Sequence, residues 1–373
     1  MRIIDLRIKN FKSIRDMHIG GIENALILVG KNSTGKTAVL DAIRAASGDY
    51  VVREEDFQED FPNIEICISL KIEEEDLKRL HRRGIVSPYR RYEAWHRDFC
   101  EKIPSYQDGI LAFEFVVNRD GKTRYGDGCQ KNNPYIPQIF PKVYYMDTQR
   151  NLDQFQDDLL MMQEDELLKQ MRSGCCMFDR AKECNHCFSC IGLIHQKTTE
   201  ELNAFEAAKL LDYKLYQLNL DAFSQSVNEN FRKNGGRDRI LYSMNRDIEK
   251  MLSVTAEIYN EKQNRRRPVN CMGKGMRSIY MLSLLETYEE QEEQAGDVIM
   301  AEDPEIFLHP KLQKVSGEIL YRLSRSSQVI FSTHSPNLLA NFNSRQIRQV
   351  VIGEDGYSQV CEKTDISAVL DDL

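Results

Sequence analysis

Residues 30–37 constrain what this chain can fold into more than any other part of the sequence. They read GKNSTGKT and fit the pattern G-x-x-x-x-G-K-T of a phosphate-binding loop. A short apolar run, Ala25–Val29, precedes the loop, and residues 36–46 carry apolar side chains at helical spacing. A strand, a glycine-rich loop and a helix in this order direct backbone amides at phosphate groups. The pattern predicts a nucleotide site, with a chance glycine turn before a helix as the alternative.

The residues of this loop have distinct expected tasks. Lys36 is expected to reach the β- and γ-phosphates of the nucleotide, and the Thr37 hydroxyl is expected to bind Mg²⁺. The remaining expected contacts to the nucleotide come from Gly30, Asn32, Ser33, Thr34 and Gly35.

Two later apolar runs are predicted to be strands that end in polar residues. Val298–Ala301 is followed by Glu302 and Asp303, and paired carboxylates at a strand end suit Mg²⁺ binding and orientation of an attacking water. Residues 329–332 form the next run, and His334 follows it. Taken singly, each of these residues has a structural alternative: the carboxylates could simply be solvated, and the histidine could be a structural residue with its hydrogen bonds made. Their order after a phosphate-binding loop favours one common site.

Two weaker signals accompany these residues. Gln149 follows a predicted strand at residues 143–146 and is interpreted either as a metal-sensing residue or as an ordinary loop residue. Gly273 and Gly275 precede an apolar helix and could present amides to a phosphate, although a glycine turn before a helix is common.

The remaining periodicities predict an α/β architecture in three segments. Residues 4–8, 63–72 and 110–117 read as strands of an antiparallel sheet beside the nucleotide sheet. Residues 151–262 are strongly charged, with apolar residues three or four apart, and predict a helical arm inserted into the nucleotide-binding fold. The expected lobes are therefore residues 1–150 and 263–373, on either side of this arm.

The arm contains a group of cysteines with metal-ligand spacing. Cys184, Cys187 and Cys190 form a C-x2-C-x2-C run, and Cys175 or Cys176 would supply a fourth thiolate for tetrahedral Zn²⁺. The same spacing occurs in iron–sulfur ligation, and a set of unliganded reduced thiols is the third interpretation.

Composition restricts the location and the partners of the chain. Its 373 residues carry a net charge of −8, ten cysteines and no apolar run near the ~18 residues of a membrane span. The N-terminus lacks the apolar stretch of an export signal, so we expect a reduced, cytoplasmic protein without membrane contact. DNA contact would have to come from local patches. Residues 77–97, where basic residues alternate with aromatic ones, are either such a patch or a solvated helix face.

The order of these motifs resembles the ABC-type ATPases, and within them the branch that contains RecF, the SMC-like proteins and the overcoming-lysogenization-defect (OLD) nucleases. The resemblance covers residues 1–50, 140–150 and 270–352 and leaves out the arm. It is carried by LRIKNFKSI at residues 6–14, MGKGMRS at 272–278, EDPEIFLHP at 302–310 and THSP at 333–336.

The resemblance implies a nucleotide site that two protomers build together. Gly273 and Gly275 would close over the γ-phosphate from the other subunit, and Gln149 would be the Q-loop residue. Glu302 would take the metal-side position, Asp303 the water-polarising position, and His334 the contact to the γ-phosphate. The chain departs from the commoner Asp-Glu order, and its shorter Asp303 argues against fast hydrolysis.

These interpretations predict an ATP-binding and ATP-hydrolysing head that works as a nucleotide-gated, head-to-head dimer or higher oligomer. Its expected role is in DNA transactions or anti-phage-type defence, with an effector or nuclease as a further partner. The alternative is a non-catalytic scaffold, in which bound ATP helps to regulate a separate effector. The TOPRIM domain that follows the ATPase in OLD-type nucleases is not found in residues 353–373, so we expect no DNA cleavage by this polypeptide alone.

Overall fold

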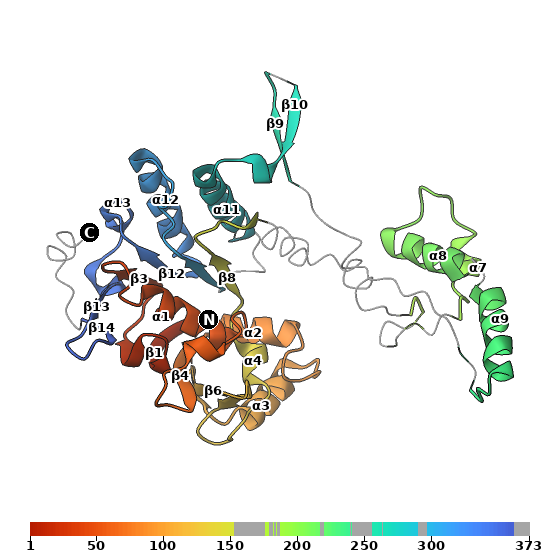
Figure 1. The fold of residues 1–373 in the computed structure, drawn as a ribbon, viewed down its shortest axis with the longest axis horizontal. Coiled ribbons are helices and arrows are strands. Elements are labelled where there is room, and N and C mark those ends of the chain that lie inside the picture. The colour runs from red at the N-terminus through yellow and green to blue at the C-terminus, as the bar shows by residue number, and fades with distance from the viewer. Residues whose placement is uncertain are drawn as a thin grey trace. The chain divides into compact units, whose positions relative to one another are not determined.

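The computed structural model forms two compact units, one made of Met1–Leu152 with Asn270–Leu373 and the other of Asp153–Val269 (Figure 1). The first, which contains both lobes of the predicted ATPase, is called the ATPase unit below, and the second is called the inserted unit. The residues that the structure describes are 1–152, 176–178, 182, 184, 187–216, 220–238, 240, 256–262, 264–289 and 297–361.

A mostly parallel six-stranded sheet is the centre of the ATPase unit. Its order is β14-β13-β3-β12-β11-β8, in which β14 is antiparallel to β13 and the other pairs are parallel. The central strands read as continuous apolar runs because both faces of the sheet are covered. The strands are β3 (Ala25–Val29), β8 (Val143–Met146), β11 (Val298–Ala301), β12 (Gln328–Thr333), β13 (Ile347–Ile352) and β14 (Ser358–Val360).

The second sheet of this unit is antiparallel, in the order β2-β1-β4-β6-β5 with β7 also paired to β6. Its apolar side chains alternate, as in β4, because one face packs on the core. Together the two sheets confirm the predicted α/β architecture with an antiparallel side sheet. The strands are β1 (Arg2–Phe11), β2 (Ile14–Gly20), β4 (Asn63–Lys71), β5 (Tyr106–Gln107), β6 (Ile110–Asn118) and β7 (Thr123–Gly126).

Helix α1 (Lys36–Ser47) packs between the two sheets. It contacts β1 and β4 of the antiparallel sheet and β12 of the parallel sheet, and its Val39, Leu40 and Ile43 are fully buried. The Gln328 side chain also links the sheets, because it accepts a hydrogen bond from Ile3 N (2.8 Å) and donates one to Ile3 O (2.7 Å). These contacts fix the position of α1, which begins at Lys36, relative to both sheets.

Helices α11 (Lys274–Glu289), α12 (Pro310–Leu323) and α13 (Pro336–Leu339) cover the other face of the parallel sheet, opposite α1 (Figure 1). Helix α12 contacts β12, α11 and α13. Smaller helices complete the unit: η1 (Glu54–Asp56), α2 (Glu74–Arg82), α3 (Tyr92–Lys102), α4 (Ile136–Ile139), η2 (Val269–Cys271), whose first residue belongs to the inserted unit, and η3 (Ser344–Gln346).

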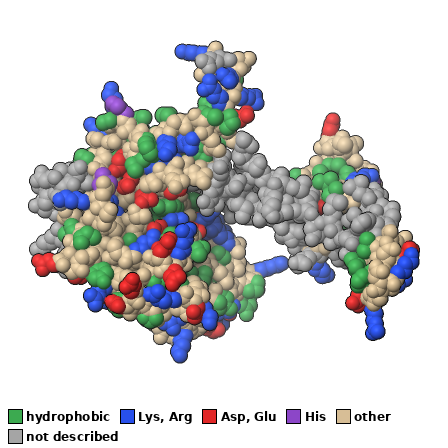
Figure 2. Space-filling model, viewed as in Figure 1, with side chains coloured by type: hydrophobic (Ala, Val, Ile, Leu, Met, Phe, Trp, Pro, Cys, Tyr) green, Lys and Arg blue, Asp and Glu red, His purple; other side chains and the backbone are tan. Residues whose placement is uncertain are grey.

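The segment with alternating basic and aromatic residues forms α2 and α3. Trp95 is fully buried, and its indole N–H donates to Ile85 O at 2.9 Å. Tyr92 stacks on Trp95 with ring centroids 5.9 Å apart. The tryptophan is therefore part of the core and cannot stack on a base, which favours the interpretation as a solvated helix face. On the face shown in Figure 2, acidic and basic side chains of the ATPase unit are mixed.

The described part of the inserted unit contains α7 (Ile191–Ile194), α8 (Ala204–Tyr216) and α9 (Leu220–Lys233), followed by an antiparallel hairpin of β9 (Glu257–Asn260) and β10 (Arg265–Pro268). The helical pattern predicted over residues 151–262 is wrong at its end, because Ile258 pairs with Arg267 in the hairpin. Residues 241–255 of the same pattern lie outside the described residues.

Among the residues that the structure describes, no helix has both the length and the apolar character needed to cross a membrane.

Candidate nucleotide-binding site

Four neighbouring parallel strands end at the same edge of the central sheet. Strand β3 leads into Gly30, β12 into His334, β11 into Glu302 and β8 into Asp147. Because the carboxyl ends of parallel strands meet, residues from distant parts of the sequence are brought to one edge, where α/β folds place their ligands. The predicted loop, acidic pair and histidine therefore lie at one edge of the sheet.

Two glycines of the phosphate-binding loop are required by the geometry around them. Gly30 has φ +148°, and a Cβ there would lie 2.3 Å from Val350 O. Gly35 has φ +102°, and a Cβ there would lie 2.2 Å from Ser358 Oγ. Both positions need glycine, because a side chain is disfavoured by the backbone conformation and excluded by the neighbouring atoms.

The Lys36 side chain is buried beneath the loop. Its ammonium donates to the carbonyls of Gly30 (2.9 Å) and Lys31 (2.8 Å). Burial lowers the pKa of this ammonium, and nearby carboxylates, that of Asp303 first, oppose the shift. The cation is thus held by neutral carbonyls at the first turn of α1, where a phosphate oxygen would be a stronger partner.

The tip of the loop is open to solvent. Asn32 and Ser33 are exposed, whereas Thr34 is buried and its hydroxyl donates to Lys31 O at 3.0 Å. Ser33 has φ +62°, which turns the chain back toward α1. The loop is therefore shaped by its own hydrogen bonds, and its amides remain near the N-terminus of α1, where a helix leaves N–H groups without intrahelical partners.

The predicted Mg²⁺ ligands lie against each other. The Thr37 hydroxyl donates to Glu302 Oε1, and the Tyr145 hydroxyl donates to Glu302 Oε2 at 2.9 Å. The Arg44 guanidinium stacks over the Tyr145 ring at 3.8 Å. Burial and the Glu302 charge raise the pKa of Tyr145, so this phenol stays a donor. A hydroxyl and a carboxylate held side by side fit the oxygen ligands that Mg²⁺ prefers.

Asp303 is held in an unusual backbone conformation next to Glu302. Its φ is +42°, in the left-handed region that few residues other than glycine adopt. The Ser332 hydroxyl donates to Asp303 Oδ1 (2.9 Å) and accepts from the Asp303 N–H (3.1 Å). Strand β12 therefore fixes the direction of this carboxylate.

Glu305 joins the acidic loop to the end of β12. Its Oε1 accepts from the Thr333 hydroxyl (2.7 Å) and from the His334 N–H (2.6 Å), while its Oε2 is buried and has no hydrogen-bond partner among the described residues. Burial raises the pKa of Glu305. Burial also lowers the pKa of the half-buried His334 imidazole, and the Lys36 ammonium lowers it further. His334 is thus kept neutral beside the loop lysine.

Gln149 and Arg150, which follow β8, lie in different surroundings. Gln149 is exposed in a turn, whereas the Arg150 side chain is fully buried. The guanidinium donates to Ser278 Oγ, to Asp147 O and to the carbonyls of Glu302 and Asp303. Burial lowers the pKa of Arg150, and the Asp147 carboxylate opposes the shift most.

The two glycines before α11 differ in their surroundings. Gly273 faces open space, with no atom within 4 Å of a Cβ built on it. A Cβ on Gly275 would lie 2.6 Å from Phe307 O, so this glycine lets α11 pack against the acidic loop of its own chain. The Lys274 ammonium lies 4.7 Å from the centre of the Phe307 ring. Phe307 and Met276 are both exposed.

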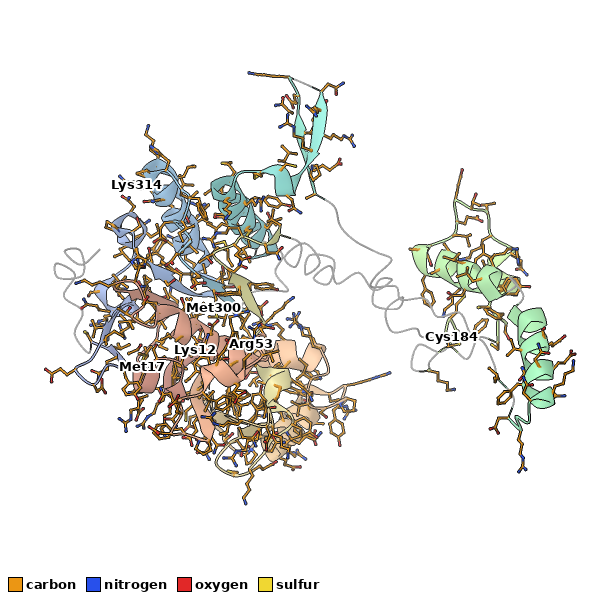
Figure 3. All side chains as sticks on the ribbon, viewed as in Figure 1. Lys12, Met17, Arg53, Cys184, Met300 and Lys314 are labelled. Carbon is orange, nitrogen blue, oxygen red and sulfur yellow. The ribbon has the colours of Figure 1, made fainter. Side chains whose placement is uncertain are left out.

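The predicted cysteine site is not supported by the described residues. Cys176, Cys184, Cys187 and Cys190 carry reduced thiols, and Cys175 lies outside the described residues. Cys190 packs in an apolar cluster, where burial raises the pKa of its thiol and disfavours the thiolate that a metal needs. Among the described residues, no three Cys, His, Asp or Glu side chains are grouped to hold zinc or an iron–sulfur cluster. Figure 3 labels Cys184 in the inserted unit.

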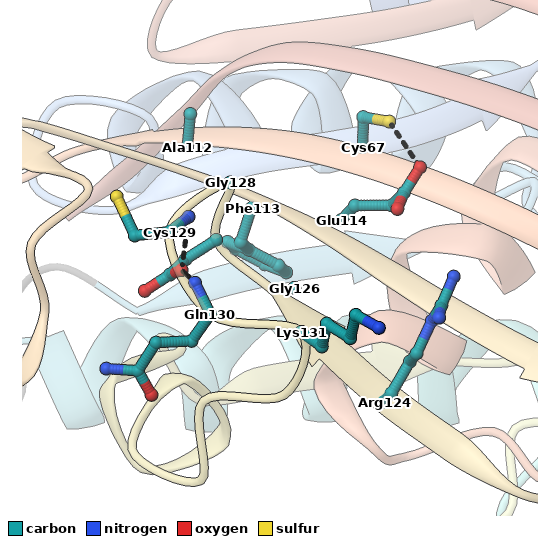
Figure 4. Close-up of a pocket in the computed structure, with 11 residues that line it drawn as sticks. Cys67, Ala112, Phe113, Glu114, Arg124, Gly126, Gly128, Cys129, Gln130 and Lys131 are labelled. Carbon is teal, nitrogen blue, oxygen red and sulfur yellow. Dashed lines mark hydrogen bonds between the residues drawn. The ribbon is translucent and has the colours of Figure 1, made fainter.

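A separate pocket of about 520 Å³ lies at the edge of the antiparallel sheet (Figure 4). Cys67, Glu114 and Arg124 line it, together with residues 126–131. No residue of the predicted nucleotide site lines this pocket. We therefore identify the candidate nucleotide site by its polar side chains at the edge of the parallel sheet, and not by this pocket.

The sequence interpretation missed Tyr145, Arg150, Glu305 and Ser332. Tyr145 and Ser332 lie within predicted strands, and Arg150 and Glu305 each lie four residues after the end of one, so proximity to a carboxyl strand end was the signal that could have marked them. Their roles come from contacts across the chain, such as the bond between Arg150 and Ser278, which are 128 residues apart.

The fold is similar to that of solved SMC heads. The Smc head domain with a coiled coil and joint derived from Pyrococcus yayanosii is 13% identical, with a TM-score of 0.51, 99% of this chain covered and 98% of that chain. The Smc head domain with an extended coiled coil bound to the C-terminal domain of ScpA, derived from Pyrococcus furiosus, is 14% identical, with a TM-score of 0.49 and the same coverage. The SMC head domain from Thermotoga maritima is 13% identical, with a TM-score of 0.44, 98% of this chain covered and 100% of that chain.

No curated protein sequence matches this chain. The family model described as AAA ATPase domain matches residues 1–83 and 146–339, which together exceed half of the chain. Both the phosphate-binding loop and the acidic pair fall inside these ranges. The chain therefore belongs to the AAA ATPase domain family.

Proposed function

We propose that this chain binds ATP with Mg²⁺ at the edge described above and hydrolyses the bond to the γ-phosphate. The observation that carries the proposal is the direct contact between Thr37 and Glu302, next to the buried Lys36 ammonium. A hydroxyl from the phosphate-binding loop and a strand-end carboxylate meet where a nucleotide-bound Mg²⁺ would be held. Membership of the AAA ATPase domain family supports the same conclusion.

Each residue has a proposed task in this reaction. Lys36 exchanges its loop carbonyls for the β- and γ-phosphates, and the loop amides and the Asn32 and Ser33 side chains surround the phosphate chain. Thr37 and Glu302 would hold Mg²⁺, which neutralises charge on the phosphate oxygens when bound. Tyr145 keeps the Glu302 carboxylate in place from its other side.

The hydrolytic step depends on the residues that follow β11 and β12. Asp303 orients the attacking water, and Ser332 fixes the direction of its carboxylate. His334 approaches the γ-phosphate as a neutral donor, with its backbone held by Glu305. Gln149 remains the proposed Q-loop residue, because it is exposed beside the same edge and available to a nucleotide.

We further propose that two chains complete the site in a head-to-head dimer. Gly273 faces open space, and the exposed Met276 and Phe307 provide apolar area beside it. A second copy would bring Gly273 to the γ-phosphate, so ATP binding would close the dimer and hydrolysis would open it. The inserted unit would transmit this change to DNA or to a separate effector, in a DNA transaction or a defence response.

A second function is favoured by one specific observation. Asp303 is one methylene shorter than glutamate, and one of its carboxylate oxygens is already bonded to Ser332. Slow hydrolysis would make the chain an ATP-bound scaffold that regulates a separate effector.

The Asp303→Asn variant tests both functions. Asparagine tolerates the left-handed backbone and keeps a bond to Ser332, but it cannot accept a proton from water. We expect the variant to bind ATP, to release no phosphate and to show twice the monomer mass by light scattering with ATP and Mg²⁺. Phosphate release at the wild-type rate would exclude Asp303 from catalysis. A wild-type protein that dimerises with ATP but releases no phosphate would favour the scaffold.

A further inference from the structure

We propose that Arg150 is a positioning residue that couples the acidic loop of the ATP site to the first turn of α11, and thereby to both chain connections of the inserted unit. This inference rests on the proposed function, because it concerns how the state of the nucleotide leaves the site. It follows from the contacts of one fully buried guanidinium.

The guanidinium of Arg150 joins three segments that are far apart in the sequence. Its Nη2 donates to Asp303 O at 2.7 Å and to Glu302 O at 3.2 Å, so it contacts the backbone of the acidic pair and not the carboxylates. Its Nε donates to Ser278 Oγ at 2.7 Å, on the first turns of α11. Its Nη1 also donates to the carbonyl of Asp147, directly after β8.

These contacts leave Arg150 little freedom. Its backbone has φ +58°, a conformation that arginine rarely adopts, and its N–H donates to Asp147 Oδ1 at 2.6 Å. A guanidinium is planar and presents its donors in a fixed fork, so a shift of one bonded partner displaces the others. A strained residue with all its donors engaged is typical of a position set by its surroundings.

Arg150 and Ser278 both lie close to the points where the chain leaves and re-enters the ATPase unit. The ATPase unit ends at Leu152 on its first pass and resumes at Asn270. Arg150 lies two residues before the first of these points, and Ser278 lies eight residues after the second. The bond between their side chains therefore joins the two chain connections that lead to the inserted unit.

The coupling acts as follows. When Glu302 and Asp303 adjust to the nucleotide, their carbonyls move relative to β8, and Arg150 carries this displacement to Ser278. Gly275 supports the same path, because its missing side chain lets α11 pack on Phe307 O in the acidic loop. Removing the Ser278 hydroxyl would leave the bonds from Arg150 to the acidic loop in place but would disconnect α11.

The Ser278→Ala variant tests the coupling, with Ser283→Ala as its matched control. Both serines are on α11, and each hydroxyl donates to the carbonyl four residues earlier, Lys274 O at 3.4 Å and Ile279 O at 2.9 Å. Ser278 is fully buried and bonded to Arg150, whereas Ser283 is exposed. Arg150→Lys is a second variant, which keeps the charge but not the fork. Urea unfolding followed by Trp95 fluorescence verifies that all three variants fold.

Two measurements decide the outcome. In Ser278→Ala we expect kcat for ATP to fall about tenfold with KM within about twofold of wild type, because binding is retained and coupling is lost. We also expect adenylyl imidodiphosphate with Mg²⁺ to slow amide exchange in residues 274–289 of the wild type and of Ser283→Ala, but not of Ser278→Ala. Arg150→Lys should behave as Ser278→Ala does.

Wild-type kcat and wild-type exchange in Ser278→Ala would overturn the coupling and leave the proposed function intact. A rise in KM with unchanged kcat would also overturn it, because Ser278 would then act on binding alone. A wild-type protein that neither binds nor hydrolyses ATP would refute the proposed function and this inference with it.

Discussion

Alanine at Gly35 should destabilise the ATPase unit far more than alanine at Gly48, although the two glycines flank the same helix. Gly35 precedes α1 with φ +102° and ψ +12°, and Gly48 follows it with φ +90° and ψ 0°. Their backbones are nearly the same, so the conformational cost of a Cβ, about 1–2 kcal/mol, applies to both positions and cancels in the comparison. What differs is the space around the added methyl group.

A Cβ on Gly48 meets nothing within 4 Å, whereas one on Gly35 would lie 2.2 Å from Ser358 Oγ and 2.9 Å from Ser13 Oγ. Relieving that overlap requires movement of β14 and loss of the 2.7 Å hydrogen bond between the two hydroxyls. Overpacking costs about 1–3 kcal/mol, and the hydrogen bond contributes about 1 kcal/mol. We therefore expect Gly35→Ala to lower the free energy of unfolding by about 2–4 kcal/mol more than Gly48→Ala.

Trp95 provides the assay, because it is the single tryptophan of the chain and is fully buried in the core that contains α1. Its fluorescence in urea gives the unfolding midpoint of the ATPase unit for both variants. A midpoint that shifts while the slope of the transition stays the same shows that the free energy of unfolding has changed. Adding Ser358→Gly to Gly35→Ala should restore part of the loss, since the substitutions act on one contact. Equal losses for Gly35→Ala and Gly48→Ala would refute the packing argument.

The remaining predictions concern Lys36, Tyr145 and Glu305. ATP with Mg²⁺ should raise the Tm of the wild type but not of Lys36→Ala, which loses the charge that faces the phosphates. Tyr145→Phe frees one oxygen of the Glu302 carboxylate and should raise the Mg²⁺ concentration for half-maximal activity about tenfold, measured by phosphate release. Burial raises the pKa of Glu305 in the folded protein, so the charged carboxylate is unfavourable there at higher pH. The wild type should therefore gain stability as the pH falls through this raised pKa, because the carboxylate then takes up a proton in the folded state. Glu305→Gln should lack this gain and be at least as stable as wild type at neutral pH. Urea titrations of the wild type and of Glu305→Gln at a series of pH values measure the difference in their free energies of unfolding. If this difference does not change with pH, the raised pKa of Glu305 is contradicted.

The strands and the phosphate-binding loop were predictable because they depend on local patterns. Continuous apolar runs marked β3, β11 and β12, and alternation marked β4, since covered faces and half-covered faces of a sheet select different side chains. The order of the loop, the acidic pair and His334 along the sequence favoured one common site, and the parallel pairing of their strands in the structure brings all three to one edge. These parts of the site need no knowledge of which side chains touch.

Arg150 and Gly275 show why the rest could not be predicted. Arg150 reads as one more charged residue after a strand, and its role depends on Ser278 and Asp303 being within hydrogen-bond reach. The contact of Gly275 with a phosphate of another subunit stays a prediction, but nothing in the sequence indicated that its close neighbour in this chain is Phe307 O. Such contacts are set by how α11 packs on the sheet, which the spacing of residues does not specify.

We propose that ATP is hydrolysed at the edge where Lys36, Glu302 and Asp303 meet. Steady-state phosphate release from ATP with Mg²⁺, measured on the wild type, Lys36→Ala and Asp303→Asn under the same conditions, tests it most directly. We expect phosphate release by the wild type and none by either variant, and of the two variants only Asp303→Asn should still bind ATP. Phosphate release at the wild-type rate in both variants would show that the reaction takes place elsewhere.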